Sequence, residues 1–346
     1  MEIGVLIGDV HSSTDPRVQM DELLRQVAAA QRNGLTYITL AQHYLYGELR
    51  CLQPVPTLAR LAGELDPGVR IATTVLEVPL YHPVALAEEL ATLDIVSGGR
   101  FTAGLGSGYR PEEFVAFGVE RSQRLGMLEE SIGLMKRLWT EDSVTHHGRY
   151  WNLDNVRPHL QPVQLPHIPL WIGASRDRGV VRAARLGAGW PITPGTTYTE
   201  MLRLLALYED ETRQAEHPYA GKHPIRREIV PAATTDAAYE RFERMAKSRL
   251  VAYANRAHPT RDATELSTRF RGAASQEAFC GTPDECVAKL TRLAAAAPVD
   301  PVLVRAHWPD MTIDEVVEYL DDLGRWIVPA VRDIESVAVV DRDAAA

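Results

Sequence analysis

Residues 3–40 read IGVLIGDVHSSTDPRVQMDELLRQVAAAQRNGLTYITL. The apolar run at residues 3–7 has the length and composition of a buried strand. Asp15 and Pro16 follow as an N-cap and a proline at the first helical position, and apolar residues then recur at helical spacing until an Asn-Gly pair ends the helix. A second apolar run occupies residues 36–40. A strand, a helix and a strand in this order predict a βα unit of a parallel sheet.

The same alternation continues along the chain. We expect further strands at 70–75, 101–105, 170–173, around Trp190, at 226–232 and at 302–305. We expect helices at 56–64, around 86–93, and at 125–139, 177–187, 198–214 and 236–254, with two more opened by capping boxes at Thr282–Glu285 and Thr312–Glu315. Roughly eight strand and helix pairs result, which is the number that a closed (β/α)8 TIM barrel requires.

Three segments depart from this alternation. Residues 143–166 are rich in aromatic and turn residues and predict a short hairpin. Residues 255–279 are polar and lack a period, which predicts a mobile insertion or lid in the barrel. We therefore expect one domain over residues 1–334 and a loose C-terminal tail at 335–346.

Composition narrows the class of protein. The chain has 346 residues, 45% of them hydrophobic, with a net charge of -9 and a pI near 5.7. An acidic chain without a polybasic run favours neither nucleic acid nor a membrane surface as a partner. Cys51, Cys280 and Cys286 form no metal-binding or disulfide spacing, and no apolar run is long enough to span a bilayer. We expect a cytoplasmic protein.

In a TIM barrel, chemistry lies just after the carboxyl ends of the strands. His43, which follows the second strand, can exchange a proton with a substrate, although a histidine hydrogen-bonded within a packed loop fits as well. The third strand ends at Thr73 and Thr74, where the residues alone indicate only a buried strand before a proline turn.

Two further strand ends carry binding candidates. Gly106, Ser107, Gly108 and Tyr109 follow the fourth strand, where alternate glycines let a backbone approach a ligand closely. A glycine-rich barrel corner is an equally good interpretation, and the match to a dinucleotide motif is weak because we expect no helix at Pro111 with the required spacing. Ala174 and Ser175 precede an expected helix, and the N-terminus of that helix could bind an anion. An ordinary N-cap without a ligand is an equally good interpretation.

Metal and nucleophile sites find less support. Asp9 and His11 could join His43 as in the metal-dependent hydrolase barrels, but no further ligands follow from later strands. His146 and His147 are adjacent and so face opposite sides of a strand. No nucleophile elbow occurs, and Cys51 has no evident activating partner. We expect no metal.

Several longer motifs together resemble the bacterial luciferase-like flavin-dependent monooxygenase family. They are residues 78–88, VPLYHPVALAE; 93–100, LDIVSGGR; 104–118, which begin GLGSGY; 124–139; 169–175, PLWIGAS; and 182–187, RAARLG. The resemblance extends from residue 1 to about 332 and is weakest over 190–280.

This resemblance implies a TIM barrel that takes reduced FMN from a separate flavin reductase and uses dioxygen to oxygenate a small organic substrate. His43 matches the family's active-site histidine, but Gln42 stands where members usually carry an acid. Thr74 and Val75 match the position of a non-prolyl cis peptide against the flavin. The positions implied to bind FMN are Thr73, Thr74, Gly106, Ser107, Gly108, Tyr109, Ala174 and Ser175.

Two alternatives remain. A relative on the same barrel uses the deazaflavin coenzyme for hydride transfer, and the luciferase family also includes a non-catalytic partner barrel. The sequence context of His43 favours FMN over the deazaflavin, whereas the intact His43, glycine loop and Ser175 favour an enzyme over a partner barrel. The resemblance further implies a homodimer or higher homo-oligomer. The substrate-lining segments match least, so only a small, largely apolar molecule is expected.

Overall fold

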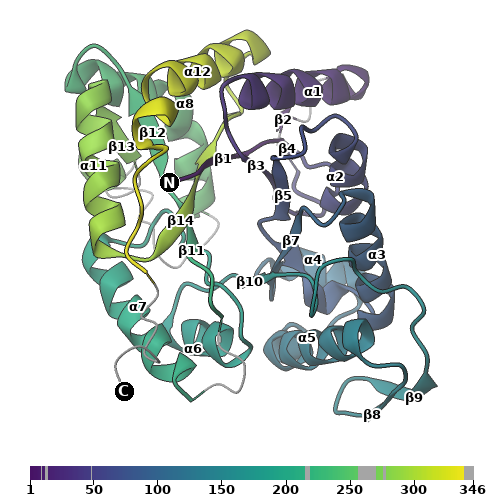
Figure 1. Ribbon diagram of the computed structural model, residues 1–346. Coiled ribbons are helices and arrows are strands. Elements are labelled where there is room, and N and C mark those ends of the chain that lie inside the picture. The colour runs from purple at the N-terminus through teal and green to yellow at the C-terminus, as the bar shows by residue number, and fades with distance from the viewer. Residues whose placement is uncertain are drawn as a thin grey trace.

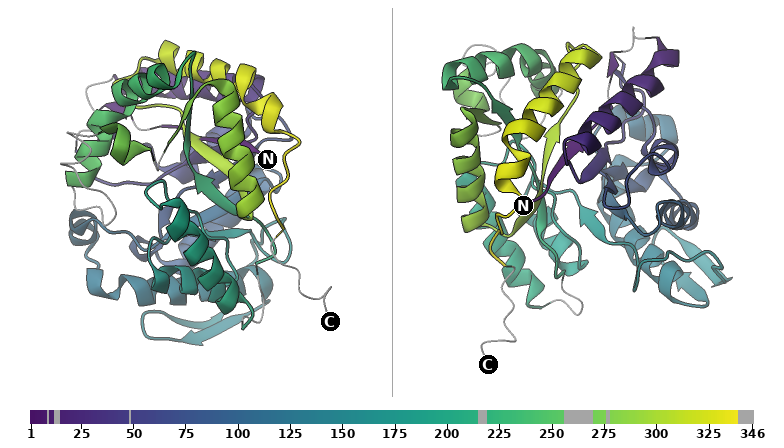
Figure 2. Two further views of the ribbon diagram at one scale, coloured as in Figure 1. Left: turned by 90° about the vertical axis from the view of Figure 1, so that its left-hand side faces the viewer. Right: turned by 45° about the horizontal axis from the view of Figure 1, so that its top comes forward.

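A curved parallel sheet organises the molecule (Figures 1 and 2). The computed structural model describes residues 1–8, 10–11, 15–47, 49–214, 219–255, 270–275 and 278–338. The strand order is β10-β7-β5-β3-β1-β14-β11, and β6 pairs with β7 beside this path. These strands are β1 (Ile3–Leu6), β3 (Tyr37–Leu40), β5 (Arg70–Thr73), β6 (Leu76–Glu77), β7 (Phe101–Gly106), β10 (Leu170–Ile172), β11 (His223–Arg226) and β14 (Val299–Arg305).

Helices follow the strands and cover the outer face of the sheet (Figure 2). The longer ones are α1 (Pro16–Arg32), α2 (Pro54–Ala62), α3 (Pro83–Val96), α5 (Arg124–Thr140), α6 (Asp177–Arg185), α7 (Tyr198–Thr212), α8 (Thr235–Asn255), α11 (Pro283–Ala296) and α12 (Ile313–Trp326). Shorter ones are α4 (Pro111–Phe117), α10 (Phe270–Ala274), α13 (Val328–Val331) and the 3-10 turns η1 (Val78–Leu80) and η2 (Arg121–Gln123). The predicted α/β alternation is confirmed.

The segment around Trp190 joins the two ends of the sheet through single bridges. Trp171 of β10 bridges Gly189, and Ile225 of β11 bridges Ile192, both in parallel. The Ile172 amide donates to the Gly189 carbonyl at 2.8 Å, and the Arg226 amide donates to the Ile192 carbonyl at 3.0 Å. In place of the expected strand, this segment forms two isolated bridges. The sheet is therefore a curled parallel half-barrel whose two ends are connected by these bridges.

The signals that begin the helices act as predicted. The Asp15 side chain accepts from the Arg17 amide at the start of α1, with Pro16 as the first helical residue. Thr282 and Thr312 form complete capping boxes with Glu285 and Glu315. Each of these caps satisfies amide groups that have no partner in the first helical turn.

Two local expectations were wrong. A helix, α4, does begin at Pro111, because the proline suits the first helical position and needs no amide partner there. The strand expected at 226–232 is split at Arg227, whose amide donates to the Leu303 carbonyl at 3.1 Å. After this point β12 (Glu228–Pro231) leaves β14 and pairs in parallel with β13 (Ala278–Gly281).

Two short antiparallel pairs lie outside the main sheet. The predicted hairpin at 143–166 consists of β8 (Val144–His147) and β9 (Asn152–Val156). The second pair is formed by β2 (Val10–His11) and β4 (Leu49–Arg50). Neither pair continues the main parallel sheet.

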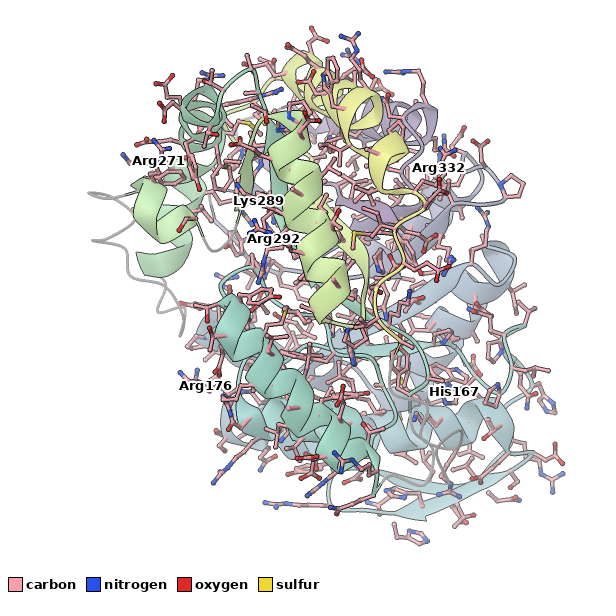
Figure 3. The ribbon with its side chains drawn as sticks, turned by 60° about the vertical axis from the view of Figure 1, so that its left-hand side comes forward. His167, Arg176, Arg271, Lys289, Arg292 and Arg332 are labelled. Atoms are coloured by element: carbon pink, nitrogen blue, oxygen red, sulfur yellow. The ribbon has the colours of Figure 1, made fainter. Side chains whose placement is uncertain are left out.

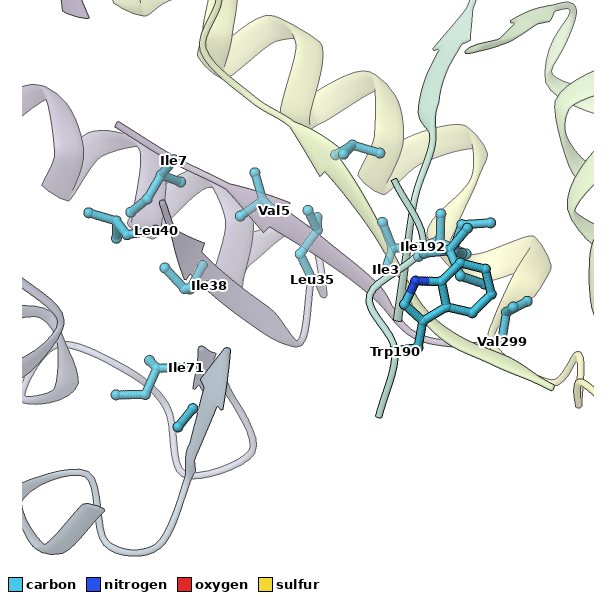
Figure 4. Packing of buried hydrophobic residues seen from close by; sticks show 14 of the residues in the cluster. Ile3, Val5, Ile7, Leu35, Ile38, Leu40, Ile71, Trp190, Ile192 and Val299 are labelled. Atoms are coloured by element: carbon cyan, nitrogen blue, oxygen red, sulfur yellow. The ribbon is translucent and has the colours of Figure 1, made fainter. Parts of the chain in front are cut away.

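The core has two layers because successive strand residues point to opposite faces. Ile3 and Val5 of β1 pack with Ile38, Leu40 and Ile71 in the large cluster between sheet and helices (Figure 4). The inner face carries a small cluster of Tyr37, Ala72, Trp171 and Leu303. A side chain at Gly4 would lie 2.5 Å from the Tyr37 Cβ, so glycine leaves the room that the inner layer needs.

Most of the insertion predicted at 255–279 lies outside the described residues, as do residues 339–346 of the predicted tail. The described ends of the insertion are regular, since they form α10 and β13. Figure 3 shows Arg271 on α10 and Lys289 and Arg292 on α11 along the same outer side of the molecule. Across the described ranges, no helix combines the length and the apolar character needed to cross a membrane.

Candidate functional site

A cavity of about 360 Å³ lies at the carboxyl ends of the parallel strands. His43 reaches it from the loop after β3, and the backbone of residues 106–109 lines it after β7. Leu6 and Leu303 form part of its apolar floor. The cavity brings together most of the residues singled out from the sequence, namely His43, Thr74, Gly106, Ser107, Gly108, Tyr109, Ala174 and Ser175.

Thr73 does not line the cavity. Its side chain is fully buried, and its hydroxyl donates to the Gly104 carbonyl at 2.8 Å and accepts from the Gly104 amide at 2.9 Å. These two bonds tie the end of β5 to β7. Thr73 therefore supports the wall of the cavity from behind.

The His43 side chain is only 13% exposed. Its Nδ1 atom lies 3.7 Å from Oε1 of Glu113, which is an ion-pair distance and too long for a hydrogen bond. The imidazole ring also contacts Tyr46 at 4.5 Å and Tyr109 at 6.2 Å between ring centroids. These contacts hold the ring at the cavity wall, with Nδ1 turned toward a carboxylate.

Glu113 on α4 is fully buried behind His43. Its Oε1 accepts from the Tyr44 amide at 2.8 Å and from Arg110 at 3.1 Å. Burial alone would raise the pKa of Glu113, but His43, the Tyr44 amide and the Arg110 charge together hold it below its ordinary value. The carboxylate beside His43 is therefore ionised at neutral pH.

Glu77 on β6 is the second buried carboxyl group of the site, and it lines the cavity. The pKa of Glu77 is raised from 4.5 to about 8. Burial is the largest cause and the neighbouring Glu113 the next, whereas the Arg110 charge lowers this pKa. Gly108 has φ +67, and a side chain there would lie 3.2 Å from Oε2 of Glu77. The glycine thus leaves space for the Glu77 carboxyl group.

Gln42 connects this region to its surroundings. Its Oε1 accepts from the Glu77 amide at 2.8 Å, and its Nε2 donates to Gln53 Oε1 at 3.1 Å and to the hydroxyls of Tyr44 and Tyr81. Burial raises the pKa of both tyrosines. A neutral amide at position 42 thus orders the backbone of Glu77, and the acidic charge near His43 comes from Glu113.

The peptide between Thr74 and Val75 is cis, as the sequence resemblance predicts. Val75 then packs beneath Gly106, where an added Cβ would lie 2.5 Å from Val75 Cγ2. Gly173 is similarly close, with an added Cβ at 3.4 Å from Val75 Cγ1. These two glycines leave room for the Val75 side chain, and all three residues line the cavity beside the cis peptide.

Ser175 lies at the cavity edge just before α6. The N-cap is Arg176, and its side chain makes no capping bond, so the first amides of α6 have no side-chain acceptor at the cap. Helix N-termini in this state favour an anion. The position is compatible with the phosphate of a nucleotide cofactor.

A family model described as luciferase-like monooxygenase matches residues 1–300. The chain belongs to this family. Members of this family include flavin-dependent monooxygenases and F420-dependent dehydrogenases.

Two curated relatives represent these two branches. The oxygenase component of flavin-dependent trigonelline monooxygenase from Acinetobacter baylyi is 29% identical over 176 residues, covering 50% of this chain and 48% of the relative. F420-dependent glucose-6-phosphate dehydrogenase from Amycolatopsis mediterranei is 27% identical over 314 residues, covering 87% of this chain and 85% of the relative. The chain spans about half the length of several curated relatives that it matches.

Solved structures show the same fold. Monooxygenase RslO1 from Streptomyces bottropensis superposes with a TM-score of 0.80 at 24% identity, covering 95% of this chain and 99% of that one. The oxygenating constituent of 3,6-diketocamphane monooxygenase from Pseudomonas putida, in complex with FMN, gives a TM-score of 0.77 at 18% identity, covering 95% and 98%. At these identities the likeness concerns the fold alone.

The cavity is also lined by Arg226, Arg249 and Arg305, which sequence reasoning missed. Arg226 pairs with Glu228 at 2.9 Å, and the second oxygen of Glu228 accepts from the Arg305 amide at 2.8 Å. The Arg305 guanidinium lies 5.5 Å from the centroid of the Trp308 ring. These arginines belong to no common sequence motif, because they lie on three separate elements, β11, α8 and β14.

Two further basic residues stand behind the glycine loop. Arg121 donates to the Tyr109 carbonyl at 3.2 Å, and Arg124 donates to the Arg121 carbonyl at 2.9 Å. The Nε of Arg124 is buried and has no hydrogen-bond partner among the described residues. Arg124 does not line the cavity, whereas the buried Thr74 hydroxyl, which has no partner among the described residues, does and could bind a polar atom of a cofactor.

Donor atoms of His43, Glu77 and Glu113 lie within 4.8 Å of one another, as they would around a cation. Arg110 pairs with Glu113 at 3.1 Å, so a cation at this cluster would share Glu113 with a guanidinium. Asp9 and the side chain of His11 lie outside the described residues.

Proposed function

We propose that this protein is the oxygenase component of a two-component monooxygenase, which receives reduced FMN from a separate reductase and oxygenates a small organic substrate. One observation carries the proposal: His43, the glycine-lined wall beside the cis Thr74–Val75 peptide, and Ser175 before α6 line one cavity. The glycine-lined wall suits a flat ring, and the N-terminus of α6 suits a phosphate. The proposal includes closure of the curled sheet into a single TIM-barrel domain over residues 1–334.

In this proposal Gly106, Gly108 and Gly173 admit the ring, while Thr74 and Tyr109 border it. Ser175, Ala174 and the first amides of α6 bind the phosphate, and Arg124 adds positive charge behind the loop. When bound, reduced flavin supplies electrons and, with dioxygen, the oxygen atom. His43 holds or moves a proton at Nε2, because its Nδ1 faces Glu113.

The relatives support an oxygenase that depends on a partner. The Acinetobacter relative is by its name the oxygenase component of a flavin-dependent monooxygenase. Because a separate flavin reductase would supply the reduced cofactor, this chain needs no nicotinamide-binding segment. We also propose a homodimer or higher homo-oligomer and a cytoplasmic location, both from the sequence resemblance.

The second candidate is hydride transfer with the deazaflavin coenzyme. It is favoured by the match to the F420-dependent glucose-6-phosphate dehydrogenase, which extends over 87% of this chain. His43 would serve equally well as a base for the hydroxyl of an alcohol substrate. We rank it second because Gln42-His43-Tyr44 resembles the FMN branch more closely.

The reaction of bound reduced FMN with dioxygen tests the monooxygenase proposal without a known substrate. Reduced FMN with excess protein is mixed with air-saturated buffer, and reoxidation is followed by absorbance. We expect a saturable, protein-dependent phase, and we expect His43→Ala to change its rate at least tenfold. The matched control is His147→Ala. His147 is an exposed histidine on β8, so its replacement should leave this phase unchanged.

Reoxidation that is the same with and without protein would contradict the proposal. Reduction of the deazaflavin by an alcohol in the presence of this protein would favour the second candidate. A protein that binds neither coenzyme would support the non-catalytic partner barrel.

A further inference from the structure

Two carboxylate oxygens at the cavity wall have no hydrogen-bond partner among the described residues. They are Oε2 of Glu77 and Oε2 of Glu113, and both belong to side chains at most 3% exposed. An ionised oxygen in this position would incur a large desolvation cost without compensation. A proton on one of the two carboxyl groups would offset this cost.

Charge counting leaves room for one proton. Glu77, Glu113 and Arg110 form a buried group in which two carboxylates would face a single guanidinium. Like charges this close cannot both stay ionised at low cost. One added proton makes the group neutral overall and supplies a hydrogen bond between the two carboxyl groups.

The surroundings decide which carboxyl group keeps the proton. Glu113 accepts from the Tyr44 amide and from Arg110, and both interactions favour its ionised form. Glu77 receives no side-chain or backbone donor at its carboxyl group among the described contacts, and the nearby phenol groups of Tyr44 and Tyr81 add no positive charge. Burial raises the pKa of Glu77 accordingly.

We propose that Glu77 holds a proton that it shares with Glu113, so that the two buried carboxyl groups act as one acid beside His43. The groups that face this pair are His43 from the loop after β3, Arg110 at the start of α4, and the phenols of Tyr44 and Tyr81.

The catalytic use of this acid rests on the proposed function. When His43 gives the proton on Nε2 to an oxygen atom of a ligand in the cavity, its Nδ1 can accept the proton of the carboxyl pair. The O–H bond of the pair breaks, an N–H bond forms on His43, and the neutral imidazole is restored. The cluster then carries one additional negative charge until water returns the proton.

The protonation of Glu77 is measured on the ligand-free protein, so it does not depend on any flavin. Infrared spectra in heavy water would show the carbonyl band of a protonated carboxyl group at pH 6.5, where ordinary carboxyl groups are ionised. We expect the band to disappear above pH 8 to 9 and to be lost in Glu77→Gln. Glu112→Gln, next to Glu113 on α4 but with a side chain 67% exposed, is the control and should keep the band.

A second measurement needs no variant, in case Glu77→Gln fails to fold. In protein labelled with carbon-13 at the glutamate carboxyl groups, one resonance should titrate above pH 6. Absence of both the band and this resonance would overturn the proposal. A band that appears only after a chelator removes a bound divalent cation would also overturn it, because the pair would then be a metal site.

Discussion

Glu77 couples the chemistry of the cavity to the stability of the fold. Its carboxyl group is buried, and its pKa in the folded protein is raised from 4.5 to about 8. The folded state therefore binds a proton that the unfolded state releases above pH 4.5. The stabilisation is complete below that pH and is lost as the pH rises through 8.

We predict that wild type loses stability relative to Glu77→Gln as the pH rises from 5 to 8. The glutamine resembles the neutral acid and does not titrate, so the difference isolates this one group. Each pH unit contributes at most about 1.4 kcal/mol, for a sum of a few kcal/mol. Urea unfolding from pH 5 to pH 9 measures it, and parallel stability curves for the two proteins would refute an elevated pKa.

His43, Thr74 and the glycine loop could be predicted because each lies directly after a strand and belongs to a continuous motif. Glu77 and Glu113 could not, because their chemistry depends on burial and on each other, and 35 positions separate them in the sequence. The sequence shows that Gln42 has no charge. Only the structure shows that the Glu113 carboxylate lies beside His43 instead.

Helix α11 shows how local signals act at the scale of an element. The Thr282 hydroxyl accepts from the Glu285 amide at 3.3 Å, and the Glu285 carboxylate accepts from the Thr282 amide at 2.8 Å. The same carboxylate accepts from the Thr235 hydroxyl at 2.6 Å, which ties α8 to α11. One capping box therefore starts one helix and fixes its neighbour.

We predict that Thr282→Ala lowers the free energy of unfolding by about 1 kcal/mol, within the range of about 0.5–2 kcal/mol typical of lost caps. Thr291→Ala on the same helix is the matched control. Its hydroxyl only donates back to the Val287 carbonyl on an exposed face, so its removal should change stability by less than about 0.5 kcal/mol. Thermal and urea unfolding measure both, and equal losses would show that the cap has no special role.

Elements with strong local signals were predicted, and those that depend on tertiary contacts were not. α1, α5, α11, α12 and the hairpin carry caps, apolar stripes or turn residues of their own. α4 has seven residues and no side-chain cap, too short to show a period. The segment around Trp190 pairs through single bridges, which no sequence pattern predicts.

His223 connects several elements at the scale of the whole molecule. Its Nδ1 accepts from the Trp190 amide at 3.1 Å, and its ring lies 4.5 Å from Tyr208 and 5.9 Å from Tyr219. Complete burial lowers its pKa from 6.5 to about 3. The folded state thus requires a neutral histidine where β11 meets the bridging segment of the sheet.

We predict that protonation of His223 lowers the free energy of unfolding in acid. The stabilisation from a neutral His223 is complete above pH 6.5 and is lost as the pH falls toward 3, by about 1.4 kcal/mol per pH unit. His223→Asn keeps an acceptor for the Trp190 amide but does not titrate, so its stability should fall less steeply between pH 6.5 and 4. Identical slopes in urea unfolding would contradict a buried neutral histidine.

At this scale the α/β class and the order of the strands followed from the alternation of apolar runs and amphipathic helices. The arginine wall of the cavity did not, because Arg226, Arg249 and Arg305 meet only when the sheet curls. These three lining residues are thus the part of the cavity that the sequence described least.

An anaerobic titration of the ligand-free protein with reduced FMN, and separately with the reduced deazaflavin coenzyme, tests the central claim most directly. The account predicts saturable binding of reduced FMN at micromolar concentrations, at least tenfold tighter than binding of the deazaflavin. Selective binding of the deazaflavin would contradict the monooxygenase assignment, and binding of neither would contradict a cofactor site in this cavity.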